Sequence, residues 1–445
     1  MAIGLIAAYF PYIFILYFYY VLYANFGNIQ REARNGRMTL PSLLFTYLIS
    51  FELLARITKS YPFVPSEYVK YITIALSAYL LILSPRKAEP IGWVMLGLLV
   101  PSLFFDMSGQ RVWYDIVNNY LAPVGLSLGV ALYGAYRPTP ELVRKTFRMI
   151  WLPLASIVVC MFVKTPDLDN VDFQLKAMSA TTGGASSNQA STMLGLGMFL
   201  SFYSLYMSEK FSGKKLLDGA FLLLFAYQGL LSFSRGGMVV GVLSIVLVIL
   251  TSNPSENLNN YKRGKKKGFP LIYMVLGAIF LVAAYMIVDQ ATGGKLSQRY
   301  QGETEGTVGG YAEKDLSRMT SGRSGIVEGD LYIFSEYPIL GGGAGSSAYL
   351  RAFLEDGMMI APHIEFTRLL AEQGLLGLIY FIVMLYIGWK SWLARKFLHS
   401  GNLLFILYVI GLLTSFHSAM RTFVTPYLIA LSSMGLGASM MSKKK

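Results

Sequence analysis

The sequence predicts an all-α polytopic membrane protein with about 12–13 transmembrane helices and one large extracytoplasmic loop that contains short helices. Of its 445 residues, 54% are hydrophobic and only 14% are charged, whereas a soluble domain carries about 25% charged residues. Many apolar runs reach about 17–25 residues, which is long enough to cross the hydrocarbon core of a bilayer. These runs show no period-2 alternation, so we expect helices and not a transmembrane β-barrel.

The apolar runs mark the spans in chain order. We predict spans at 3–26, 40–57, 67–84, 90–106, 113–135, 147–164, 188–208, 216–232, 236–252, 268–288, 366–389, 402–417 and 424–441. The N-terminus lacks the basic region of a cleaved signal peptide, so the first segment is expected to be a genuine span. The single cysteine, Cys160, excludes a disulfide or a cysteine zinc site within one chain.

The basic residues set the expected orientation. The net charge is +13, but Lys and Arg cluster in short loops between apolar runs, which is the positive-inside pattern and not a nucleic-acid-binding face. The strongest cluster, Tyr261–Lys267, is expected in the cytoplasm, which places the N-terminus outside and the C-terminus inside. The other segments expected in the cytoplasm are 27–39, 85–89, 136–146, 209–215, 390–401 and the tail. The expected surroundings are therefore a lipid bilayer, with no nucleic acid as partner.

This pattern divides the chain into three parts. Residues 1–288 hold about ten spans, 289–365 form the large outer loop, and 366–445 hold about three spans. A long ordered loop is often functional. Within it, Ser324–Tyr337 predicts a short amphipathic helix, after which Pro338 and the glycine run Gly341–Gly345 break the chain. That run lacks the lysine and the strand-to-helix setting of a phosphate loop, so we expect a flexible bend.

Arg235 is the first candidate functional residue. It lies between two apolar runs in Ser234-Arg235-Gly236-Gly237, at the outer end of a helical hairpin, where the positive-inside pattern disfavours a cation. One interpretation is an interfacial arginine that reaches lipid phosphate. The other is an anion site, in which the two glycines let a phosphate approach a helix N-terminus.

Arg323 and His363 are the other two candidates. Arg323 precedes the expected loop helix and can fork onto two phosphate oxygens, although a solvated loop charge is the alternative. His363 lies where the outer loop re-enters the membrane, and a neutral imidazole there could accept a proton from a sugar hydroxyl. Glu365 is the second candidate base. Glu372, deeper in the same span, is expected either to pack between helices or to support the residues that contact substrate.

The other two histidines and a search for known cofactor motifs give little further indication of function. His417 ends a span near the outer face beside Arg421, whereas His399 falls in a basic loop. The sequence has no Walker loop, zinc motif or serine-nucleophile motif, so we expect no cofactor and no metal.

Taken in order, several of these segments resemble the O-antigen ligase family, within the wider O-antigen ligase and polymerase superfamily. His363 is followed after ten residues by Gly374-Leu375-Leu376-Gly377, which resembles the family's histidine-to-GxxG signature. The other matching segments are Ser187-Asn188-Gln189, Ser234-Arg235-Gly236, Arg323 before its helix, and Tyr337–Gly343. The resemblance covers about residues 180–415.

The resemblance implies a reaction on the extracytoplasmic face of a bacterial inner membrane. The donor is a glycan linked to undecaprenyl pyrophosphate, and the acceptor hydroxyl belongs to lipid A–core in a ligase or to another lipid-linked repeat unit in a polymerase. The resemblance implies that His363, or else Glu365, takes the acceptor proton, while Arg235 and Arg323 bind the pyrophosphate. Further substrate contacts are expected at Asn188, Arg351 and Arg368. One-step displacement without a metal would invert the anomeric centre.

Two departures keep the choice between ligase and polymerase open. Ile364 follows the histidine where the ligase signature usually has a small polar residue, and Val239 stands four residues after Arg235 where a leucine is common. We also count one span more than the usual twelve. A transporter or lipid-linked-glycan flippase is the alternative of another class. Transporters place charges near the midplane, but here Glu52 has Arg56 one turn away as a partner.

Overall fold

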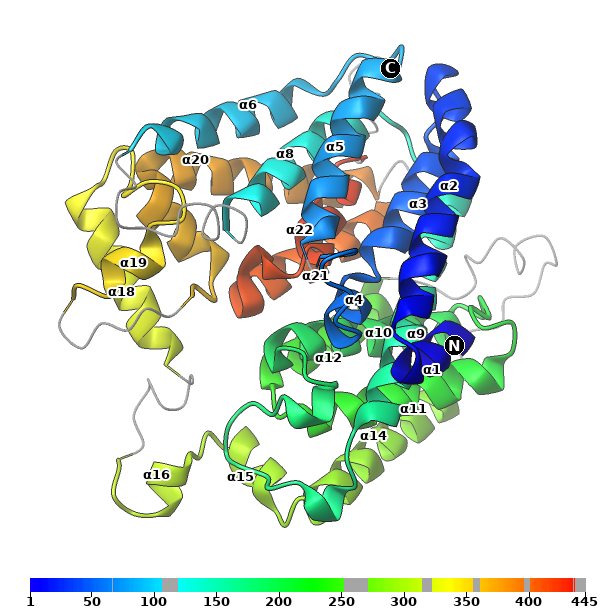
Figure 1. Cartoon of the computed structure of the whole chain (residues 1–445), viewed down its shortest axis with the longest axis vertical. Coiled ribbons are helices and arrows are strands. Elements are labelled where there is room, and N and C mark those ends of the chain that lie inside the picture. The colour runs from blue at the N-terminus through cyan, green and yellow to red at the C-terminus, as the bar shows by residue number, and fades with distance from the viewer. Residues whose placement is uncertain are drawn as a thin grey trace. The chain divides into compact units, whose positions relative to one another are not determined.

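The structure is a computed structural model, which describes residues 1–65, 67–105, 119–251, 271–313, 322–354, 361–395, 401–434 and 436. Throughout these ranges the regular elements are helices, and no strand occurs (Figure 1). The prediction of an all-α protein is confirmed. The basic cluster 261–267, His399 and parts of the predicted spans 113–135, 268–288 and 424–441 lie outside the described residues.

Many of the helices are apolar enough to lie in a membrane. Within the described residues, five meet both the length and the hydropathy of a membrane span, namely Tyr12–Arg34, Thr39–Ile57, Pro140–Lys164, Glu365–Ala394 and Asn402–Arg421. Shorter apolar helices are Tyr68–Leu83, Pro90–Phe104, Leu121–Tyr133, Arg235–Thr251 and Gly277–Ala291. The chain is therefore a multi-pass membrane protein, and the count of 12–13 spans stays a prediction.

The surface of these helices is apolar where lipid would contact it. On α12 (Arg235–Thr251) the side chains of Val239, Val242, Leu243, Val246 and Leu250 are all exposed. Their spacing of three or four residues places them on one face of the helix. In water such a continuous apolar stripe would be costly, whereas in hydrocarbon it needs no protein partner.

The first predicted span is interrupted near its start. Its residues form α1 (Ala2–Tyr9) and α2 (Tyr12–Arg34), separated at Phe10 and Pro11. Proline has no backbone N–H and disfavours helical geometry in the residue before it, so the two helices stop and start there. The second predicted span likewise comprises α3 (Thr39–Ile49) and α4 (Glu52–Ile57).

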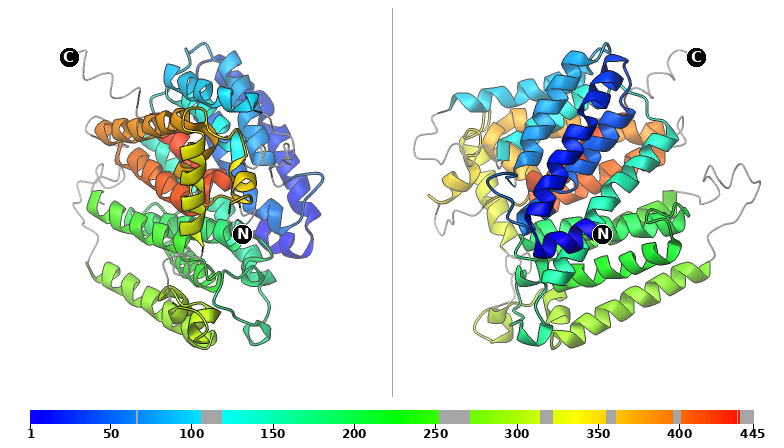
Figure 2. Two further views of the ribbon diagram at one scale, coloured as in Figure 1. Left: turned by 90° about the vertical axis from the view of Figure 1, so that its left-hand side faces the viewer. Right: turned by 45° about the vertical axis from the view of Figure 1, so that its right-hand side comes forward.

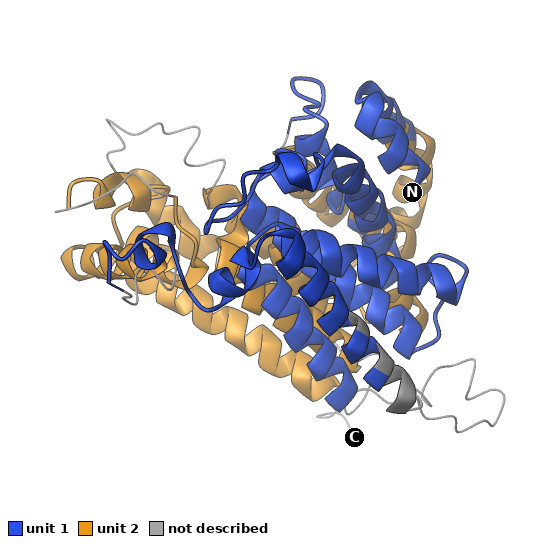
Figure 3. Cartoon of the chain, turned by 90° about the horizontal axis from the view of Figure 1, so that it is seen from below, with its two compact units in different colours: residues 1–20, 46–66, 145–321 blue, residues 21–45, 67–144, 322–445 orange. Residues whose placement is uncertain are grey.

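The chain forms two compact units (Figure 3). Unit 1 comprises residues 1–20, 46–66 and 145–321, and unit 2 comprises 21–45, 67–144 and 322–445. Helices α2, α3 and α9 (Pro140–Lys164) contribute residues to both units. The outer loop 289–365 is also divided, at residue 321, and the three-part organisation predicted from the sequence stays a prediction.

Unit 1 is organised around α10 (Ser187–Tyr206), which packs against α11 (Lys215–Leu231) and α12. A Cβ on Gly195 would lie 2.0 Å from the carbonyl oxygen of Gly237, so α10 and α12 approach backbone to backbone. The other elements that lie wholly in this unit are α1, α4, η3 (Leu168–Asn170), η4 (Ala180–Thr182), α14 (Leu271–Ala291), α15 (Lys295–Tyr300) and α16 (Glu305–Val308).

Unit 2 holds the loop helix and the C-terminal spans. The predicted helix Ser324–Tyr337 is confirmed as α18 (Arg323–Glu336), which packs against α20 (Glu365–Ala394) (Figure 2, yellow and orange). The hydroxyl of Tyr380 on α20 donates to the Pro123 carbonyl at 2.8 Å. The remaining elements are α5 (Tyr68–Leu83), α6 (Pro90–Leu99), η1 (Val100–Phe104), α8 (Leu121–Tyr133), α19 (Ser347–Arg351), α21 (Gly401–Ser418), η6 (Ala419–Arg421) and α22 (Val424–Ser432).

Candidate functional site

The long helix α20 is broken at Gly374, inside the segment that spans the membrane. Gly374 has φ +60° and ψ −137°, a conformation essentially restricted to glycine. A Cβ at this position would lie 2.6 Å from both the Gly341 nitrogen and the Pro338 carbonyl oxygen. The first glycine of the Gly374-Leu375-Leu376-Gly377 motif is therefore required both by its backbone conformation and by the loop that packs on it.

That loop satisfies the backbone groups that the break leaves open. The amide of Leu375 donates to the Pro338 carbonyl at 2.8 Å, and the amide of Gly342 donates to the Ala371 carbonyl at 2.8 Å. The amide of Gly343 donates to the Glu372 carbonyl at 3.1 Å. Such pairing is needed because a broken helix at membrane depth has no water to satisfy it.

The glycine run 341–345 is thus an ordered turn, and the prediction of a flexible bend is wrong. Gly341, Gly343 and Gly345 all have positive φ. A Cβ on Gly341 would lie 2.3 Å from the Glu372 backbone, so only glycine allows this close approach. The sequence alone could not reveal the partner, since it lies some thirty residues further along the chain.

A buried ion network occupies the first two turns of α20. Arg368 is 1% exposed and forms ion pairs with Glu365, which is 1% exposed, and with Glu372, which is fully buried. Ser347 donates to the second oxygen of Glu372 at 2.8 Å, and the Met420 amide donates to Glu365 at 3.0 Å. These contacts place Glu372 inside the protein, as both interpretations of this residue expected. Glu365 and Arg368, which are predicted from the sequence to act on substrate, form a buried ion pair with each other.

A second buried pair joins α18, α19 and α20. Arg351, which is 4% exposed, forms an ion pair with the fully buried Asp330. The Thr367 hydroxyl donates to the other Asp330 oxygen at 2.8 Å. A buried charge is tolerated only with such partners. The pair fixes the loop helix against the spanning helix, directly beside the segment that carries His363.

His363 lies just before α20 and is partly buried. Its backbone carbonyl accepts a hydrogen bond from the Ala419 amide at 2.9 Å, which fixes the segment. Its Nδ1 atom is buried and has no hydrogen-bond partner in the described part of the chain. Burial, together with the positive charges of Arg421, Arg323 and Arg351, lowers the pKa of His363 to about 4. The imidazole is therefore neutral at pH 7, and its unprotonated ring nitrogen can accept a proton.

Arg323, the first residue of α18, contacts the Nδ1 atom of His417 at 3.2 Å. Because a guanidinium has no acceptor, His417 must accept this bond in its neutral form. The sequence places His417 near the outer end of a span but does not indicate a role for it. Its contact with Arg323 joins residues 94 positions apart in the chain, a relation that local sequence patterns do not encode.

Arg235 begins α12 in unit 1, after a tight turn in which Phe233 has φ +54°. The neighbouring Ser234 hydroxyl donates to the side-chain oxygen of Asn188 at 2.8 Å and accepts from Ser191 at 2.9 Å. Asn188 and Arg235 are both partly exposed. Arg235 also lies within electrostatic range of Tyr300.

Gly237 allows the close packing of two helices in this hairpin. A Cβ on Gly237 would lie 2.2 Å from the Ser191 backbone, so α12 packs closely on α10 at this position. The approach of a phosphate to the start of α12 stays a prediction.

The predicted site residues thus fall into two groups. Unit 2 brings together Arg323, His363 and Arg351 with the newly found His417 and Arg421, while Arg235 and Asn188 share a hairpin in unit 1. Within the described residues, no three His, Cys, Asp or Glu side chains gather as a metal site would require.

The comparison with known families gives one match. Residues 220–382 match the family model described as O-antigen ligase. This match supports the O-antigen ligase and polymerase superfamily for the matched part of the chain. The region matched to the O-antigen ligase family runs from α11 past the Gly374 break and contains Arg235, Arg323 and His363. The matched family implies an enzyme of the glycosyltransferase type. No curated protein matches the chain.

Proposed function

We propose that this enzyme transfers a glycan from undecaprenyl pyrophosphate to an acceptor hydroxyl on the extracytoplasmic face of a bacterial inner membrane. The preferred acceptor is lipid A–core, as in a ligase. The observation that carries the proposal is His363, a neutral imidazole in the positive field of Arg323, Arg351 and Arg421. In such a site the arginines can bind an anionic donor, while the neutral imidazole beside them can accept a proton.

In the proposed step His363 is the general base. The acceptor oxygen attacks the anomeric carbon while its proton passes to the imidazole. The bond between the anomeric carbon and the pyrophosphate oxygen breaks, and its electron pair leaves with undecaprenyl pyrophosphate. A single displacement of this kind inverts the anomeric centre.

The arginines carry the charge of the leaving group. We assign the pyrophosphate to Arg323, because a guanidinium donates two parallel hydrogen bonds to phosphate oxygens. The same role for Arg235, which lies in unit 1, stays a prediction from the sequence. Fixed positive groups stabilise the charge that develops on the leaving oxygen, so the step needs no metal ion. His417 accepts a bond from Arg323 and is a positioning residue.

Donor binding also activates the base. A pKa of about 4 makes the free imidazole a weak base at neutral pH. A bound pyrophosphate offsets part of the positive field of Arg323 and Arg421, and the pKa of His363 then rises towards the operating pH. The proton is thus accepted only when the donor is in place.

The contacts favour His363 over Glu365 as the base. Both carboxylate oxygens of Glu365 are occupied by Arg368 and the Met420 amide, and the side chain is 1% exposed. We therefore assign Glu365, Arg368 and Arg351 to holding the site in shape, and Asn188 to substrate contact. A polymerase, with a second lipid-linked repeat unit as acceptor, is the alternative that Ile364 favours.

Reconstitution tests the proposal. The full chain in liposomes without an ion gradient is given an undecaprenyl-pyrophosphate glycan and lipid A–core, and glycan transfer is followed on gels. His363→Gln should abolish transfer, whereas His399→Gln, in a predicted cytoplasmic loop, should not. Lengthening of the lipid-linked glycan without lipid A–core would establish the polymerase. Full activity of His363→Gln would reject the base, and substrate movement across the bilayer without transfer would indicate a transporter.

A further inference from the structure

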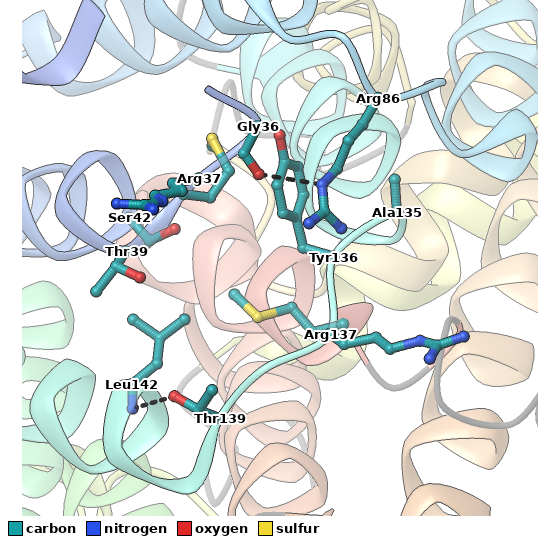
Figure 4. Close-up of a pocket in the computed structure, with 12 residues that line it drawn as sticks. Gly36, Arg37, Thr39, Ser42, Arg86, Ala135, Tyr136, Arg137, Thr139 and Leu142 are labelled. Atoms are coloured by element: carbon teal, nitrogen blue, oxygen red, sulfur yellow. Dashed lines mark hydrogen bonds between the residues drawn. The ribbon is translucent and has the colours of Figure 1, made fainter. Parts of the chain in front are cut away.

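Unit 2 contains a pocket that the transfer reaction does not use. Its volume is about 540 Å³, and it lies where three connections meet (Figure 4). These connections are the turn between α2 and α3, the segment after α5 and the segment between α8 and α9. All three belong to segments that the positive-inside pattern predicts to be cytoplasmic, whereas the proposed transfer site is extracytoplasmic.

The lining is strongly basic. Arg37, Arg86 and Arg137 each come from a different connection, and none of the twelve described residues that line the pocket is acidic. The nearby carboxylate of Glu32 accepts a hydrogen bond from the Leu40 amide at 2.9 Å and is not part of the lining. A concave site lined by one sign of charge concentrates the opposite ion.

Arg86 is held in place across two of these connections. Its Nε donates to the Gly36 carbonyl at 3.1 Å, and its guanidinium carbon lies 4.7 Å from the centre of the Tyr136 ring. The Tyr136 hydroxyl is itself hydrogen-bonded to Ser84 at 2.7 Å. Because Nε donates to Gly36, the two terminal guanidinium nitrogens of Arg86 take no part in this hydrogen bond. Arg86 is thus a pre-positioned fork of the kind that binds phosphate.

The other two arginines are exposed at the pocket. Arg37 lies beside Ser42, and the Arg137 side chain extends away from Arg86 (Figure 4). Long exposed side chains reorient at low cost, so Arg37 can turn towards an anion that Arg86 holds. The 25-residue helix α9 also starts here, with the Leu142 amide capped by the Thr139 hydroxyl at 3.1 Å. The positive end of its dipole adds to the arginines.

We propose that this pocket binds a phosphate group on the cytoplasmic side of the protein. The phosphate belongs either to the head group of an anionic membrane lipid or to free inorganic phosphate. Three arginines around one cavity match the charge of a phosphate group, and the positioned guanidinium of Arg86 matches the geometry of its oxygens. The site shares no residue with the proposed glycan-transfer site, so it is a second binding site of this enzyme.

Binding to the purified full-length protein in neutral detergent, stripped of lipid, tests the proposal. The probes are phosphatidylglycerol, counted by native mass spectrometry, and inorganic phosphate, titrated by calorimetry, with phosphatidylcholine as the zwitterionic control. The pocket variant is Arg37→Gln with Arg137→Gln. The matched control is Arg31→Gln with Arg34→Gln, which removes the same charge from exposed positions on α2 outside the pocket.

The wild type and the control should bind a phosphate probe equally, and the pocket variant should bind it about tenfold more weakly or worse, as expected for lost charge-assisted hydrogen bonds. Binding of phosphatidylglycerol alone would identify a lipid head group, and binding of inorganic phosphate would identify the free ion. The proposal is overturned if neither probe binds, if the pocket variant binds like the wild type, or if the control loses as much affinity. Neither donor nor acceptor is present, so the result is independent of glycan transfer.

Discussion

Arg323 and His417 meet at 3.2 Å, guanidinium to Nδ1, and join the start of the loop helix α18 to the end of the spanning helix α21. Neither residue type is unusual at a membrane surface. Their contact gives the arginine a fixed direction at the point where the proposed donor pyrophosphate binds. The His417 imidazole that accepts this hydrogen bond is neutral.

Removing the acceptor should therefore weaken donor binding more than turnover. We expect His417→Leu to raise KM for the lipid-linked donor about tenfold, since a hydrogen bond to a charged group contributes about 1.5–3 kcal/mol, with a smaller effect on kcat. His417→Asn, whose side-chain oxygen can replace Nδ1 as acceptor, should recover most of the affinity. Equal kinetics for the Leu and Asn variants would show that the contact does not position Arg323.

The pH dependence should report the neutral state of His363. The pKa of about 4 lies below the ordinary 6.5, so the acid limb of kcat/KM, which reports the free enzyme, should fall near pH 4. The acid limb of kcat should lie at higher pH, because bound pyrophosphate offsets the arginines. Arg421→Gln should move the kcat/KM limb upwards. An inflection near 6.5 in the wild type would contradict the assigned environment.

The free energy of unfolding should also depend on pH, because the pKa of His363 is lower in the folded protein than in the unfolded chain. Between pH 4 and 6.5 the unfolded chain holds a proton on His363 that the folded protein does not, so stability rises with pH through this window and is lost on acidification. His363→Gln should reduce this dependence of the melting temperature in detergent. A variant with the same dependence as the wild type would place the titration on another group.

Gly374→Ala should damage the fold. Alanine at φ +60° and ψ −137° is strained by about 1–3 kcal/mol, and its Cβ would lie 2.6 Å from the Pro338 oxygen and the Gly341 nitrogen. We expect a melting temperature several degrees lower and loss of transfer. Gly219→Ala on α11 is the matched control, because a Cβ there meets nothing within 4 Å. Its stability should be unchanged or slightly higher. If both variants melt like the wild type, the break at Gly374 is not required.

Glu365→Gln separates the two candidate bases. The amide oxygen can still accept from Met420, but the ion pair with Arg368 is lost in a buried site. Breaking a buried pair costs about 3–5 kcal/mol, so the melting temperature should fall markedly, while the folded fraction keeps measurable transfer. His363→Gln should show the reverse, with a folded protein and no transfer. Normal stability with complete loss of activity in Glu365→Gln would instead make Glu365 the base.

Local features of the chain were sufficient to predict the class of protein. Composition, run length and the distribution of Lys and Arg predicted a multi-span helical membrane protein, and local helix periodicity predicted α18 within one residue at each end. These features are local: hydropathy and helix formation depend on residues within a few turns of each other. The candidate residue types at Arg323 and His363 could be selected for the same reason, since a charge or imidazole beside an apolar run is visible in the chain.

The interactions between those residues could not be predicted from local sequence, because they depend on the folded arrangement of the chain. The pairing of Arg323 with His417, the docking of the glycine turn on the Gly374 break, and the burial of Glu365 against Arg368 and Met420 depend on the packing of helices and loops. Burial among arginines, and not residue type, lowers the pKa of His363. The physical reason is that charge, solvation and close approach are set by neighbours in space, and most of those neighbours are far apart in the sequence.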